Sequence, residues 1–174
     1  SPAALVTRRA RGPWSSRPTT SRAWVAAYGV VAVLLALLPA VAIGAGAALP
    51  LLVSDAPTGY VDALALLWWL PVSTLVALVV LAALVLLVVR LAGLSVEAGV
   101  HPVRSRQSLA VWATMRTLDE ARTWLFPLYS STLTPLWLRA LGASIGADVE
   151  ASTVLLIPKL TQVNDQAFLA VGFI

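Results

Sequence analysis

The chain has 174 residues, of which 59% are hydrophobic and 11% are charged, whereas an ordinary soluble domain carries about 25% charged residues. This much apolar side chain excludes an intrinsically disordered chain, and so few charges argue against a single soluble domain. Because the chain contains no cysteine, disulfides, thiolate metal sites and cysteine nucleophiles are also excluded.

The basic residues lie next to the apolar segments. Five arginines precede the first apolar run and Arg90 closes the second, which is where positive charges set the topology of a membrane protein. Although the formal net charge is +4, this placement argues against nucleic-acid binding. The arginines before the first run are Arg8, Arg9, Arg11, Arg17 and Arg22.

Two uncharged runs predict a pair of transmembrane helices. Residues 29–49 and residues 70–89 would each form a helix of about 30 Å, which matches the hydrocarbon core of a bilayer. The 54–62 loop has two acidic residues and no basic one, whereas seven basic residues follow residue 89. Both ends of the chain are therefore expected in the cytoplasm. The alternatives are a cleaved signal peptide or two buried helices of a soluble protein, and the length of the runs disfavours both.

Small residues recur at every fourth position of the first run. Residues four apart share a helix face, and a stripe of small residues lets a second helix approach closely in lipid. A chance series is the alternative, because alanine is common in this chain. Ser73 and Ala77 are the matching notch expected on the second helix. The stripe consists of Ala32, Ala36, Ala40, Gly44 and Ala48.

Residues 93–140 predict a cytoplasmic connector of short helices. Ser105 is expected to cap a helix over residues 107–126. A second helix is expected from Thr134, as its N-cap, to a stop at Gly142. In the first of these helices, two pairs of opposite charges have the spacing of ion pairs, Arg116 with Glu120 and Asp119 with Arg122.

A six-residue pattern of the form aliphatic-Gly-x-x-aliphatic-x begins at Leu141. Residues 141–146 and 145–150 fit it in overlapping frames, and residues 163–168 are a weaker copy with Asn in place of Gly. In a left-handed parallel β-helix each such hexapeptide forms one flat side of a coil, with its aliphatic residues inside. The aliphatic positions expected to face later coils are Ile145, Val149 and Phe168.

The predicted fold class is therefore membrane α, with a two-helix transmembrane hairpin, short cytoplasmic helices and the start of a left-handed parallel β-helix. The expected organisation is a basic linker (1–23), the transmembrane helix pair (24–92), the helical connector (93–140) and an incomplete hexapeptide-repeat β-helix (141–174). Fewer than two coils fit into the last segment. These residues alone are expected to insert into a membrane but to have no activity of their own.

Several short strings, spread over residues 101–153, resemble the C-terminal region of ε-poly-L-lysine synthetases and related nonribosomal peptide synthetase-like proteins. The resemblance covers roughly residues 24–170, and the chain departs from the family string at residues 171–174. The matching strings are His101–Ser105, Trp112–Ala121, Leu125–Tyr129, Thr134–Arg139, Leu141–Ala143 and Ala151–Thr153.

The resemblance implies part of an enzyme that joins carrier-activated amino acids through amide (isopeptide) bonds, with lysine as the amino acid in poly-lysine synthetases. ATP and carrier-bound phosphopantetheine are implied for upstream domains, and no cofactor or metal is expected in this segment. The implied location is the plasma (inner) membrane of a bacterium. The expected partners are membrane lipid, other helix pairs and tandem domains of the same protein, and further copies in a homo-oligomer.

The chain offers few residues for catalysis, and no catalytic residue is assigned. His101 is the only imidazole, but no carboxylate stands beside it in the sequence to orient the ring. Asp148, Glu150 and Asp165 are typical of solvated corners in β-helix repeats. A membrane-tethered hexapeptide-repeat acyltransferase and a non-catalytic anchor or scaffold therefore stay open beside the amide-forming enzyme.

The charge asymmetry predicts which parts of the chain face opposite sides of the membrane. Cysteines introduced at Thr58 and at Ser108 are expected to react with an impermeant thiol reagent from opposite sides of sealed vesicles. The native chain has no cysteine, so each label reports a single position. Labelling of both positions from the same side would rule out a two-span hairpin.

Overall fold

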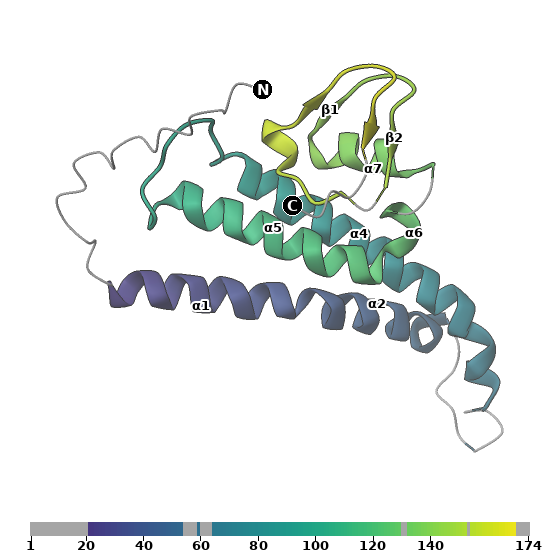
Figure 1. Ribbon diagram of the computed structural model, residues 1–174. Helices are drawn as coiled ribbons and strands as arrows, with labels where there is room; N and C mark the ends of the chain where they lie inside the picture. Colours follow the sequence, from purple (N-terminus) through teal and green to yellow (C-terminus); the bar gives the residue numbers. More distant parts are fainter. Residues whose placement is uncertain (1–20, 54–58, 60–63, 130–131, 153, 170–174) are drawn as a thin grey trace, which may run out of the picture.

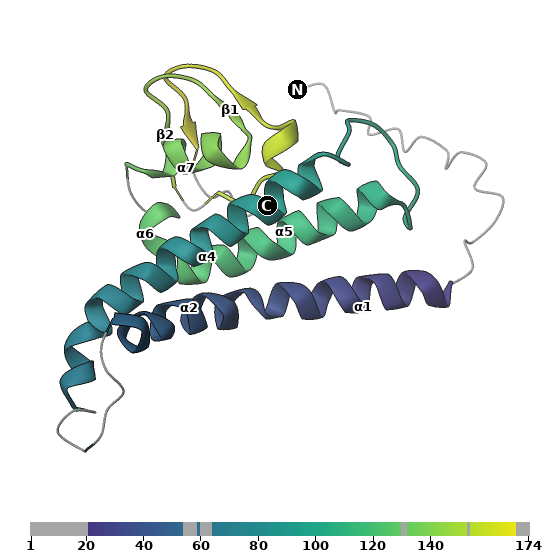
Figure 2. The same cartoon turned by 180° about the vertical axis from the view of Figure 1, so that it is seen from behind.

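The computed structural model describes residues 21–53, 59, 64–129, 132–152 and 154–169. Figures 1 and 2 show three levels, with α1 and α2 along one side, α4 and α5 in the middle, and α7 with the strands on the opposite side. The described part of the chain is mostly helical.

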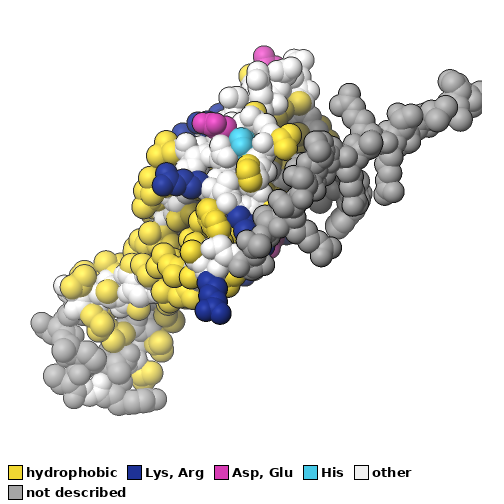
Figure 3. Space-filling view, turned by 90° about the vertical axis from the view of Figure 1, so that its left-hand side faces the viewer, with side chains coloured by type: hydrophobic (Ala, Val, Ile, Leu, Met, Phe, Trp, Pro, Cys, Tyr) yellow, Lys and Arg dark blue, Asp and Glu magenta, His cyan; other side chains and the backbone are white. Residues whose placement is uncertain are grey.

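Two apolar helical segments are long enough to cross a membrane. The first consists of α1 (Arg22–Ala36) and α2 (Leu38–Val53), and the second consists of η1 (Leu66–Trp69) and α4 (Leu70–Gly93). Only 11% and 17% of their most apolar windows are buried, whereas the core helix of a soluble protein is mostly buried. On the face that Figure 3 shows, exposed hydrophobic side chains gather in the middle and lower part. Both segments are therefore candidate membrane spans, as predicted.

α2 and α4 pack through a glycine. Ala42, Gly46 and Pro50 are buried along one face of α2. A Cβ atom at Gly46 would collide with the carbonyl oxygen of Ser73 and would lie 3.0 Å from Cβ of Ala77. The expected notch on α4 therefore lies in the contact, and Gly46 is the residue that faces it.

The predicted stripe of small residues lies on a different face. A Cβ atom at Gly44 would meet nothing within 4 Å. Packing of this stripe against a second copy or another helix pair stays a prediction. Of its five members only Ala48 is half-buried, and the exposed ones are Ala32, Ala36, Ala40 and Gly44.

One row of α4 packs against the rest of the chain. Leu81, Val85 and Val89 are buried and belong to one hydrophobic core that runs from α2 to the strands. α5 (Arg106–Trp124) packs on α4 with a face of small residues. The buried positions of α5 are the small residues Ala110, Ala113, Thr114, Thr117 and Ala121, together with Leu118.

The start of α5 is fixed by its cap and by a contact with α1. The Ser108 backbone N–H donates to Oγ of Ser105 over 3.1 Å, which confirms the predicted N-cap. Tyr28 lies edge-on to Trp112 at a ring distance of 5.1 Å, and its hydroxyl is 3.2 Å from Oγ of Ser108. α5 therefore lies against both α1 and α4 and is not a separate helix on the surface.

α7 (Thr134–Leu141) docks the strands on the helices. Trp137, Leu138 and Leu141 are buried in the shared core. The helix ends at Gly142, whose φ of 111° lies in the left-handed region that suits glycine. This end was predicted, whereas Thr134 is the first residue of the helix and not its N-cap. α6 (Phe126–Tyr129) joins α5 to this region.

Four two-residue strands form two parallel pairs. β1 (Ser144–Ile145) pairs with β3 (Gln162–Val163), and β2 (Glu150–Ala151) pairs with β4 (Phe168–Leu169). Each residue of β1 and β2 pairs with the residue 18 positions later in the chain. Within the described residues, the two pairs do not close into a β-helix.

We call residues 144–152 the first layer and residues 162–169 the second layer. The register places the hexapeptide 145–150 on the hexapeptide 163–168, so this frame and not the overlapping 141–146 frame matches the structure. Ile145 and Val149 are buried, as expected. Phe168 was expected to face later coils; it pairs with Glu150 and is 69% exposed, so a contact with later coils stays a prediction.

The glycine contact between α2 and α4 predicts opposite effects for two neighbouring substitutions. Gly46→Ala is expected to destabilise the hairpin by about 1–3 kcal/mol, because the added methyl group overpacks the contact. Gly44→Ala faces open space and should be neutral or stabilising by up to about 1 kcal/mol, the difference in helix propensity. Thermal unfolding in detergent, followed by circular dichroism, measures both. Equal midpoints for the two variants would contradict this assignment.

Candidate functional site

Two arginines join the apolar helices to the layers. Arg90, in the last turn of α4, donates from Nε to the carbonyl oxygen of Ala140 over 2.7 Å and from Nη2 to that of Arg139 over 3.5 Å. These carbonyls are at the C-terminal end of α7, where a helix presents unpaired acceptors and partial negative charge. Arg90 was predicted to set topology, and here it also caps a helix.

Arg139 continues this network into the first layer. Its guanidinium donates from Nε to the carbonyl oxygen of Ile145 over 2.9 Å and from Nη2 to that of Gly146. A planar guanidinium suits two parallel acceptors because its N–H groups form a rigid fork. The order of contacts is therefore α4, Arg90, the end of α7, Arg139 and the first layer.

The two layers approach most closely at Gly146. A Cβ atom there would collide with the backbone of Asn164 and with Asp165, so only glycine fits. Oδ1 of Asp165 accepts the Ala147 N–H over 2.7 Å, and the Gly146 N–H donates to the carbonyl oxygen of Val163 over 2.9 Å. An open polar depression of about 400 Å³ lies over this corner.

The next corner repeats the same backbone conformation in both layers. Asp148 has φ 51° and Gln166 has φ 58°, and these two residues are also 18 positions apart. Non-glycine residues seldom adopt this left-handed conformation. Its recurrence at one register position shows that the layers share a common turn.

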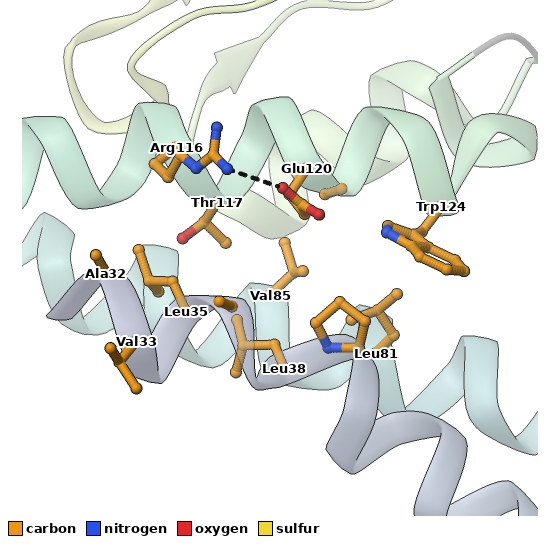
Figure 4. Close-up of a pocket in the computed structure, with 13 residues that line it drawn as sticks. Ala32, Val33, Leu35, Leu38, Leu81, Val85, Arg116, Thr117, Glu120 and Trp124 are labelled. Carbon is orange, nitrogen blue, oxygen red and sulfur yellow. Dashed lines mark ion pairs between the residues drawn. The ribbon is translucent and has the colours of Figure 1, made fainter. Parts of the chain in front are cut away.

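A cavity of about 390 Å³ lies where α1, α2, α4 and α5 meet. Figure 4 shows Arg116 and Glu120 of α5 on one wall, joined by an ion pair of 3.5 Å, and apolar side chains of the other helices opposite. The hydroxyl of Thr117 donates to the Ala113 carbonyl oxygen over 2.7 Å. Arg116, Glu120 and Thr117 thus form the polar wall of a cavity that is otherwise mostly apolar.

A second cavity of about 450 Å³ lies between α2 and α4. Its lining is almost entirely apolar, with Ser73 and Thr74 as its hydroxyl-bearing residues. Pro39, Leu81 and Trp124 line both cavities. The two cavities therefore adjoin at the last residue of α5.

Among the side chains that the structure describes, that of Tyr129 has a shifted pKa. Burial raises the pKa of its phenol above the ordinary value. Its ring lies edge-on to Trp137 at 6.2 Å, deep in the shared core. Tyr129 is 1% exposed and is therefore a packing residue of this core.

The other residues singled out from the sequence are separated. His101 Nε2 lies 3.0 Å from the Glu97 carbonyl oxygen in an exposed turn. Asp148 and Glu150 lie in the first layer and Asp165 in the second, and within the described ranges no three acidic or histidine side chains form a metal site. Of the arginines before the first run, Arg22 begins α1. The other four, Arg8, Arg9, Arg11 and Arg17, lie outside the described residues.

Comparison of this chain with protein-family models, with curated proteins and with solved structures gives no match. The features of the site therefore have to be interpreted from their own geometry. The capping role of Arg90 and the two cavities were not foreseen from the sequence. An arginine at the end of a span carries the same sequence signal whether it faces water or a helix end, and a cavity between helices has no local sequence signal.

The contacts of Arg90 predict a loss of coupling when its fork is removed. Arg90→Lys keeps the positive charge that bears on topology but cannot reproduce both hydrogen bonds. We expect the opening free energy of α7 and the first layer to fall by about 1 kcal/mol, and hydrogen exchange there to become roughly fivefold faster. Arg122→Lys, which changes an exposed pair with Asp119, is the control. Unchanged exchange in the Arg90 variant would contradict the capping role.

Proposed function

We propose that this chain is a membrane-embedded section of a nonribosomal peptide synthetase-like enzyme that forms amide (isopeptide) bonds between carrier-activated amino acids. The amino acid is lysine, as in the poly-lysine synthetases that the sequence resembles. The two apolar segments hold the chain in the plasma membrane of a bacterium with both ends in the cytoplasm. The two layers belong to the first two successive coils of a left-handed parallel β-helix of the acyltransferase type.

The observation that carries this proposal is the 18-residue offset of both strand pairs. A coil of three hexapeptides has this length. Parallel strands are usually connected by an α-helix, but the described parts of both connections contain no α-helix, only one strand of the other pair and the short η2 (Pro158–Leu160). A coil explains such a connection, whereas a βαβ unit does not.

The attachment of the layers supports a role at the membrane. Arg90 links the end of α4 to α7, and Arg139 links α7 to the first layer. The layers are therefore held at a fixed place relative to the apolar helices. A carrier domain that delivers activated amino acids to such a coil would meet it beside the bilayer. We assign no ATP or phosphopantetheine site to these residues, and upstream domains would supply both.

The test uses membranes that contain the gene product in which these 174 residues occur. With lysine and ATP supplied, we expect lysine oligomers joined by amide bonds, detected by mass spectrometry. Gly146→Ala is expected to lower product formation at least tenfold, because the added methyl group separates the layers. Gly29→Ala is the matched control, since a Cβ atom there meets nothing within 4 Å.

Each other outcome points to a different function. Transfer of an acyl group to a small acceptor without amide-linked lysine would favour the hexapeptide-repeat acyltransferase. Full activity of the Gly146→Ala variant would mean that close contact between the two layers is not needed for product formation. Such a result would favour an anchor or scaffold role for this part of the chain.

A further inference from the structure

The two adjoining cavities have the shape of a site for an amphiphile. The cavity next to α5 carries one cation and one anion, Arg116 and Glu120. The cavity between α2 and α4 is lined almost wholly by apolar side chains. Trp124 stands at their junction and is 46% exposed. A molecule with a polar head and an apolar tail can therefore occupy both cavities at once.

The depth of the charged cavity along the apolar segments matches that of a lipid headgroup. About 20 helical residues cross the hydrocarbon core. Counted from Val53, the far end of the first segment, this length ends near Val33, which lines the charged cavity. Counted from Leu66, it ends near Val85, which also lines that cavity. Counted from these ends, the spans are about residues 33–53 and 66–85 instead of the expected 29–49 and 70–89. The charged cavity then lies at one edge of the core and the apolar cavity lies within it.

The aromatic residue at the junction fits the same depth. The amphipathic ring of tryptophan favours the boundary between hydrocarbon and headgroups. Trp124 is the last residue of α5, and the charged residues of this helix all precede it. The polar helix therefore reaches the membrane with an aromatic residue and holds its ion pair at headgroup level.

The charges select the kind of headgroup. Arg116 and Glu120 are 57% and 43% exposed, so both are accessible to a ligand. An exposed ion pair contributes only about 0–1 kcal/mol, and a ligand with both charges can replace it at little cost. A phosphate would bind the guanidinium, and a primary ammonium would donate hydrogen bonds to the carboxylate.

We propose that these cavities bind one phosphatidylethanolamine molecule, with its phosphoethanolamine group at Arg116 and Glu120 and an acyl chain in the groove between α2 and α4. Phosphatidylglycerol lacks the cation for Glu120. Phosphatidylcholine has a quaternary ammonium without an N–H donor. The inference does not depend on the proposed synthetase function, since it uses only the helices and their charges.

Native mass spectrometry of the full chain in detergent tests the site. The protein is mixed with equal amounts of phosphatidylethanolamine, phosphatidylcholine and phosphatidylglycerol that have identical acyl chains. We expect the ethanolamine lipid to be retained at least tenfold over the other two. Arg116→Gln and Glu120→Gln should each weaken that binding by roughly tenfold, as expected for loss of a charge-assisted hydrogen bond.

The neighbouring ion pair provides matched controls. Arg122 and Asp119 lie on the same helix, 3.0 Å apart, and do not line either cavity. Arg122→Gln and Asp119→Asn should leave the lipid preference unchanged. Equal retention of the three lipids, preference for phosphatidylglycerol, or equal losses in the control variants would overturn the proposal.

A second measurement locates the lipid and guards against unfolded variants. Phosphatidylethanolamine with a brominated acyl chain should quench part of the tryptophan fluorescence, and Trp124→Phe should remove that part. Ala36→Phe, at an exposed position that lines the charged cavity, should fill the site and reduce binding while both charges remain. Circular dichroism spectra that match the native protein confirm that each variant is folded. Quenching that is unchanged in Trp124→Phe would also overturn the proposal.

Discussion

The fold depends on one row of α4, Leu81, Val85 and Val89, which has to serve several partners at once. Residues four apart lie above one another on a helix, so the row presents a single ridge. α2 contributes Ala42 to the same core, and α5 contributes Leu118 and Ala121 from a buried face that otherwise consists of small residues. A bulky residue on either partner face would force the helices apart, because a packed core has no space to absorb it.

This shared row divides α4 into two functional halves. The half that begins at Leu70 packs on α2 through Gly46, and it is otherwise exposed to whatever surrounds the apolar segments. The half that ends at Arg90 is covered by α5 and α7. One continuous helix therefore connects the exposed apolar half with the layers. A displacement at one end cannot be absorbed by a flexible linker, because the described chain has none at this place.

The sequence was sufficient where a short-range signal decides the structure. The capping of α5 by Ser105, the helix stop at Gly142 and the spacing of the hexapeptides all depend on a few neighbouring residues. The sequence was insufficient where contacts between residues far apart in the chain decide which side chains are buried. The choice of Gly46 over Gly44 depends on which face α4 covers, and the outward position of Phe168 depends on the register with Glu150. Both cavities likewise arise from the angles between helices.

The position of α7 has a consequence for the order of folding. α7 packs against β1, β2 and η2 and thereby covers one end of the stacked layers. In stacked architectures each unit is stabilised mainly by its neighbours, and a terminal cap removes one direction of growth. The helices also leave the ribosome before the layers, since they come first in the chain. We therefore expect folding to proceed in one direction along the chain. The helices fold first and are the template for the first layer, and the first layer is then the template for the second.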